Sequence, residues 1–120
     1  MGCFFGKKTN TIDYARREIK KGAYNNRNSQ YGWNVDHILP ISKDGKTADH
    51  NLICCHVLTN HEKADSFPLF NANGQKFKIV KKHRHYEIKN SNEIKEHENE
   101  KHDNDFNLML TTILYKYTNL

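Results

Sequence analysis

The chain has 120 residues, of which 36% are apolar and 28% are charged, and its formal net charge is +5. This length predicts one domain, and the composition is that of a polar globular protein. A helical membrane protein is excluded because no apolar run approaches the roughly 20 residues that cross a bilayer. No signal-peptide core follows Met1, so we expect a cytoplasmic protein without a membrane partner.

The charge is unevenly distributed. Residues 1–89 hold sixteen Lys and Arg against eight Asp and Glu, whereas residues 90–120 hold three against six. A basic body with an acidic tail favours a polyanionic partner for the body. Many soluble proteins are mildly basic, so the charge alone selects no function.

The first expected element is an N-terminal helix over Ile12–Lys21, which Asn10 caps and Gly22 ends. Its apolar residues recur at helical spacing, and a basic stripe occupies its other face. Residues 23–32 are rich in Asn and are expected to form a loop.

Residues 33–63 predict a strand, a polar loop, a second strand and a short helix. The sequence WNVDHILP (33–40) suits a half-buried strand that Pro40 ends. NLICCHV (51–57) is the second strand. Thr59 and Glu62 have the spacing of a capping box at the start of the helix.

The part downstream predicts a β-hairpin around Asn73-Gly74, with a possible third strand at 85–89. Residues 90–105 are expected to be a polar, acidic linker. The apolar segment 106–120 is then expected to dock on the domain or on a partner, which includes a homodimer contact.

Polar residues stand at fixed places in the strand–strand–helix segment. Asn51 and Asn60 follow His37 by 14 and 23 positions. If the strands pair antiparallel, Asp36 lies near the first turn of the helix, where Asn60 can face it across a small pocket. Carboxylate and amide oxygens suit Mg²⁺. His37 points to the opposite face of its strand, so a bend is needed before it serves the same site.

The stretch YGWNVDHILPISKDGKTADHNLICCHVLTNHEKAD (31–65) resembles the motif of the HNH endonucleases, the ββα-metal or His-Me finger nucleases, in an H-N-N variant. The resemblance implies an α+β fold with a small ββα-metal core, here with an N-terminal helix and a downstream β-hairpin. The nuclease domain would span residues 1–89, with the motif core at 31–66.

The resemblance also implies a role for each matching residue. His37 corresponds to the general base and Asp36 to a metal ligand. Asn51 holds the loop that positions His37, and Asn60 is the second ligand. Most relatives carry His at this last position, so His61 is the alternate ligand if the register differs by one.

The implied activity is metal-dependent hydrolysis of DNA phosphodiester bonds, by nicking or double-strand cleavage, in a bacterial or phage-type protein. One divalent ion is expected, Mg²⁺ foremost, with Mn²⁺ as another option, and RNA stays open as a substrate. The expected phosphate contacts are Lys63, Arg27, Lys43 and Lys46.

Two other classes of protein remain compatible with the sequence. One is an HNH-fold module that binds nucleic acid without cutting it, because Asn60 fails to hold metal. The other is a structural zinc protein that uses His56, His61 and one of the adjacent cysteines Cys54 and Cys55. Neighbouring strand residues face opposite sides, so both cysteines cannot reach one ion. Separately, KKHRH (81–85) is either a second phosphate-binding patch or an exposed strand end.

Overall fold

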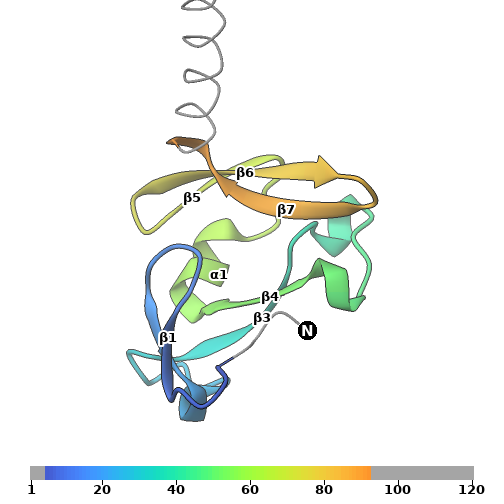
Figure 1. Cartoon of the computed structure of the whole chain (residues 1–120). Helices are drawn as coiled ribbons and strands as arrows, with labels where there is room; N and C mark the ends of the chain where they lie inside the picture. Colours follow the sequence, from blue (N-terminus) through green and yellow to red (C-terminus); the bar gives the residue numbers. More distant parts are fainter. Residues whose placement is uncertain (1–4, 93–120) are drawn as a thin grey trace, which may run out of the picture. The chain divides into compact units, whose positions relative to one another are not determined.

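The computed structural model describes residues 5–92, which are mostly β-structure (Figure 1). Seven strands form three small antiparallel sheets, and the described part of the chain contains one α-helix, α1 (Val57–Lys63). The strands are β1 (Asn10–Ile12), β2 (Glu18–Lys20), β3 (Trp33–His37), β4 (Leu52–His56), β5 (Leu69–Ala72), β6 (Gln75–Lys82) and β7 (His85–Asn90). The expected α+β class, with an N-terminal helix and a ββα core, is therefore wrong.

The expected N-terminal helix is replaced by a hairpin of β1 and β2. Asp13 explains the difference, because its carboxylate accepts hydrogen bonds from the backbone N–H of Ala15 (2.9 Å) and Arg17 (2.8 Å). Such local side-chain bonds compete with helix formation and favour a turn. Arg16 has a φ of +69°, which no right-handed helix contains. The supposed basic helix face does not exist.

The middle sheet consists of β3 and β4, which run antiparallel with Trp33 opposite His56 and His37 opposite Leu52. The helix α1 follows β4 directly. His56 is its N-cap, since the ring nitrogen Nδ1 accepts a hydrogen bond of 3.0 Å from the N–H of Leu58. The helix thus begins earlier than the expected capping box at Thr59.

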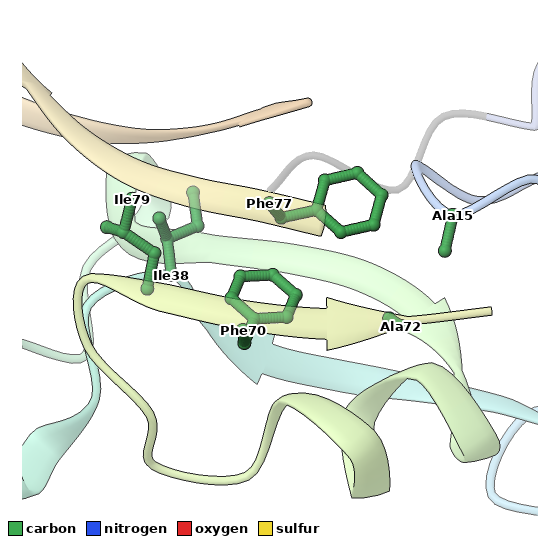
Figure 2. Close-up of a cluster of buried hydrophobic side chains, with 6 residues drawn as sticks. All are labelled: Ala15, Ile38, Phe70, Ala72, Phe77 and Ile79. Atoms are coloured by element: carbon green, nitrogen blue, oxygen red, sulfur yellow. The ribbon is translucent and has the colours of Figure 1, made fainter. Parts of the chain in front are cut away.

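The hairpin predicted at Asn73-Gly74 is confirmed, and it belongs to a three-stranded sheet of β5, β6 and β7. Both turn residues have positive φ, +50° and +72°, the geometry that Asn-Gly supplies at low cost. Phe77 and Ile79 alternate on β6 with exposed lysines and pack into the main core (Figure 2). Phe77 stacks on Phe70 of β5 with ring centroids 5.3 Å apart.

Figure 1 shows α1 between the β3–β4 sheet and the β5–β6–β7 sheet. Short 3₁₀ turns occur at η1 (Lys21–Ala23), η2 (Ile41–Lys43) and η3 (Asp49–Asn51). No helix within residues 5–92 is long and apolar enough to cross a membrane. Apart from residues 90–92, the predicted linker and the apolar segment 106–120 lie outside the described residues, and the domain limits stay a prediction.

Candidate active site

Two polar pairs join β3 to α1. Asn34 and Asp36 are two residues apart on β3 and therefore share one face of the strand. The amide nitrogen Nδ2 of Asn60 donates to Oδ1 of Asn34 at 2.8 Å, and the Lys63 ammonium lies 3.0 Å from Oδ2 of Asp36. Two residues about one helical turn apart on α1 thus contact two residues on the same face of β3. Asn60 was expected to face Asp36, but its recorded partner is Asn34.

Lys63 is fully buried, with 0% of its side chain exposed, while Asp36 retains 15%. Besides the ion pair, Nζ of Lys63 donates a 2.8 Å hydrogen bond to the backbone carbonyl of His37. A buried ammonium is stabilised only by such partners. The expected phosphate contact does not fit this position, because no part of the side chain reaches the surface.

His37 ends β3 and is partly exposed. Its ring nitrogen Nε2 lies 2.8 Å from the hydroxyl Oγ1 of Thr47, a residue of the exposed loop before η3. Its carbonyl is held by Lys63 from the helix side. The backbone and the ring of His37 are therefore each fixed by a separate contact.

Asn51 closes the loop that follows β3. Its buried amide accepts a hydrogen bond from the N–H of Leu39 (2.9 Å) and donates to the carbonyls of Leu39 (3.1 Å) and Lys46 (2.8 Å). Gly45 sits so close to this loop that an added Cβ would lie 1.8 Å from the Leu39 carbonyl oxygen. The loop is thereby pinned immediately before Thr47, the partner of His37.

The surface beside Asn60 is a cavity of about 370 Å³. Its lining residues are Arg27, Asn34, Val57, Leu58, Asn60 and His61. The candidate ligand, its alternate and one expected phosphate contact therefore meet here. Lys43 is exposed at the end of η2, and Lys46 lines a different cavity.

The oxygen donors of the site fit a hard divalent cation. A carboxylate has about four acceptor positions, and Oδ2 of Asp36 has only the Lys63 ion pair. Mg²⁺ needs one or two carboxylates and keeps several waters. Residues 5–92 contain no cluster of three or more His, Cys, Asp or Glu side chains suited to a metal. The oxygen types of Asp36 and Asn60 suit a water-rich ion, but Asn60 contacts Asn34, and Asp36 is not among the residues that line the cavity beside Asn60.

The surroundings of Asp36 have a low polarity, as two neighbouring groups indicate. Burial raises the pKa of the Cys55 thiol far above its usual range, and the carboxylates of Asp36 and Asp13 raise it further. Burial likewise raises the pKa of the Tyr14 phenol. Both groups are protonated and neutral near pH 7, so Cys55 offers no thiolate to a metal.

His56 is a structural residue. While Nδ1 caps α1, Nε2 donates to the carbonyl of Gln30 at 2.7 Å, and its backbone N–H donates to Asp13 at 3.0 Å. Both ring nitrogens are thus engaged within the protein, which removes His56 from the structural zinc hypothesis.

Two residues of the site carried no clear signal in the sequence. Asp13 ties the β1–β2 turn to the start of α1, and Thr47 contacts His37 from ten positions away. Asp is common in turns, which was the one available indication for Asp13. A threonine in a polar loop has no distinguishing pattern.

Residues 14–69 match the family model described as HNH endonuclease. Within this range lie β3, β4, α1 and every residue expected to act as base or ligand. No curated protein and no solved structure matches the chain. The match supports the HNH endonuclease family for residues 14–69 and suggests a nuclease-type function for this segment.

Proposed function

We propose that the protein is a metal-dependent endonuclease that hydrolyses phosphodiester bonds of DNA, with His37 as general base. The observation that supports this most is the fixed position of His37 at the end of β3, one residue after the partly buried carboxylate of Asp36. A fixed imidazole one residue after a carboxylate suits the activation of a water molecule next to a metal-bound phosphate, provided that the end of β3 bends so that both side chains reach one site.

The proposed tautomer of the His37 ring follows from its contact with Thr47. If Nε2 carries the hydrogen and donates it to Thr47 Oγ1, the lone pair of Nδ1 is free to accept a proton from water. The water oxygen then bonds to phosphorus while the bond from phosphorus to the 3′ oxygen breaks. A divalent ion held by Asp36 and Asn60 would supply Lewis-acid polarisation of the phosphate and neutralise the leaving oxygen. Lys63 lies 3.0 Å from Oδ2 of Asp36 and offsets its negative charge.

The first test is the dependence of cleavage on metal. The full chain should nick supercoiled plasmid DNA in the presence of Mg²⁺ or Mn²⁺, and excess EDTA should abolish nicking. The conversion of supercoiled to open-circular DNA on an agarose gel measures this. Restored nicking when Mg²⁺ is added beyond the EDTA is the control for irreversible damage. Cleavage at an undiminished rate in EDTA would contradict the metal-dependent mechanism.

Thr47 is proposed as a positioning residue for the base. Replacing Thr47 by Val keeps the shape and removes the hydroxyl, so the His37 ring loses its partner and its preferred tautomer. We expect kcat to fall about tenfold with an unchanged KM, an effect at the lower end of general-base contributions. Single-turnover cleavage at several pH values measures the change.

A matched variant distinguishes positioning from folding. Thr47→Ser retains the hydroxyl and should restore most of the rate, and both variants should unfold at the wild-type urea concentration. Equal rates for Thr47→Val and the wild type would show that the hydroxyl does not orient the base.

A second candidate function is binding of nucleic acid without cleavage. It is favoured by one observation: Asn60 donates to Asn34, while Asp36 is paired with Lys63. If this arrangement persists with DNA bound, the two oxygen donors do not share an ion. Retarded DNA on a native gel, with intact plasmid across Mg²⁺, Mn²⁺, Co²⁺ and Ni²⁺, would support this function instead.

A further inference from the structure

A second cavity, of about 350 Å³, is lined in part by the loop that Asn51 closes. Figure 1 shows the β6–β7 turn beside the segment that contains η3, and contacts join η3 to β7. The cavity is lined by Leu39, Asp44, Gly45, Lys46, His50, Asn51, Arg84, His85 and Tyr86. Two segments far apart in the sequence therefore build one concave surface.

The charged side chains that line this cavity are mostly positive. Lys46 comes from the loop before η3 and Arg84 from the β6–β7 turn, and both are exposed. The rings of His50 and His85 lie against each other, with centroids 4.3 Å apart. Asp44 contributes the carboxylate among the lining residues. Two full positive charges against one negative charge favour an anion with several acceptor oxygens.

The position of Lys46 links this cavity to the candidate active site. Its carbonyl accepts a hydrogen bond from Asn51, and the next residue, Thr47, contacts His37. A strand of nucleic acid whose scissile phosphate lies at His37 therefore passes close to the loop that carries Lys46. Each strand of duplex DNA carries one phosphate per about 3.4 Å of helix axis, so a strand that passes His37 and Lys46 presents phosphates to both places.

We propose that the cavity between the 44–51 loop and the β6–β7 turn binds a backbone phosphate of the DNA strand, at a position beside the scissile one. Lys46 and Arg84 would hold the phosphate by charge-assisted hydrogen bonds, with His50 and His85 as further donors. The proposal rests on the proposed function in taking DNA as the ligand. It adds a contact from β6 and β7, which lie outside the family-matched residues 14–69.

The shape of the β6–β7 turn supports this use. Lys82 pairs with His85 across the strands, so His83 and Arg84 alone form the turn. His83 has a φ of +58°, which closes the turn tightly. A short turn holds Arg84 at the end of two paired strands, so its guanidinium is presented from a rigid support. Lys82 already has a carboxylate neighbour in Glu87, at 3.9 Å, and is not required here.

The test compares the salt dependence of DNA binding for charge-removing variants of the full chain. A fluorescent 30-base-pair duplex is titrated in EDTA, which prevents cleavage, at several NaCl concentrations. For duplex DNA, log K falls as log salt rises, and each lost phosphate contact reduces the magnitude of this slope by about 0.9. In the Lys46→Gln/Arg84→Gln double variant, the magnitude of the slope should therefore fall by about twice this value. The double variant should also bind roughly tenfold more weakly at 0.1 M salt.

Two controls belong to this experiment. Lys76→Gln removes one exposed charge at the opposite end of β6 and should leave the slope near the wild-type value. Arg84→Lys retains the charge and should restore most of the slope that Arg84→Gln loses. If Lys76→Gln changes the slope as much as Arg84→Gln, only the total charge matters and the proposed site is wrong.

The outcome is separable from that of the proposed function. Loss of slope in the double variant supports the phosphate site even if no metal produces cleavage, in which case the nuclease proposal alone fails. An unchanged slope overturns the phosphate site even if the wild type cuts DNA. When cleavage occurs, the double variant should have a raised KM with kcat largely retained, because its contacts lie away from the reacting atoms.

Discussion

Replacing His37 by alanine is expected to lower the rate of DNA cleavage about 100- to 10,000-fold, the range that general-base catalysis contributes. The imidazole of His37, which lies at the end of β3 and contacts Thr47, is the proposed proton acceptor. Without it, water loses its proton acceptor, while the carboxylate of Asp36 and the fold are left in place. Single-turnover cleavage of a labelled duplex at saturating protein measures the loss.

The same variant should bind DNA as the wild type does, because its partly exposed ring lies in no buried cluster. Binding in EDTA is the matching measurement. Lys76→Ala, at an exposed position of β6 that lines neither cavity, should keep the full cleavage rate. A His37→Ala protein that cuts within threefold of the wild-type rate would exclude His37 as the base.

The sequence singled out His37 by a spacing, with Asn51 and Asn60 at +14 and +23 as in the HNH motif. In the structure, Asn51 bonds to the backbone of Leu39 and Lys46, which does not test its role in catalysis. The roles of the base and the ligands remain predictions. The contacts of Asn60 and Lys63 were not predictable, because they depend on which residues of β3 face α1 and on how deeply the helix packs.

The local part of the fold was also partly predictable. Asn73-Gly74 marked a hairpin because these residues adopt positive φ readily, and β6 alternates between core and solvent. The N-terminal error has a definite cause. Ala15 and Ile19 are both buried, and their spacing also suits a helix, but Ala15 lies in a turn and Ile19 on β2. The hydrogen bonds that favour a turn over a helix are accepted by Asp13, and the spacing of apolar residues gives no sign of them.

Replacing Lys63 by methionine is expected to destabilise the protein by about 3–5 kcal/mol, as the removal of one partner from a buried ion pair does. Methionine fills most of the space but leaves Oδ2 of Asp36 buried without a cation and the His37 carbonyl without its donor. Urea unfolding of the full chain, followed by far-UV circular dichroism, measures the change. Lys76→Met, at an exposed position, should change the stability by less than about 0.5 kcal/mol.

The contribution of the pair itself is given by a double-mutant cycle. Asp36→Asn removes the negative charge, so the Asp36→Asn/Lys63→Met protein should be less destabilised than the sum of the two single changes by at least about 1 kcal/mol. Strict additivity would show that the ammonium and the carboxylate do not interact in solution.

The response of the same variants to Mg²⁺ gives a second measurement. If Asp36 is a metal ligand, the unpaired carboxylate in Lys63→Met gains a cation, and Mg²⁺ should raise the unfolding midpoint of this variant more than that of Asp36→Asn/Lys63→Met. An equal response of the two variants would place the ion away from Asp36, and the assignment of the metal site would then fail independently of any cleavage assay.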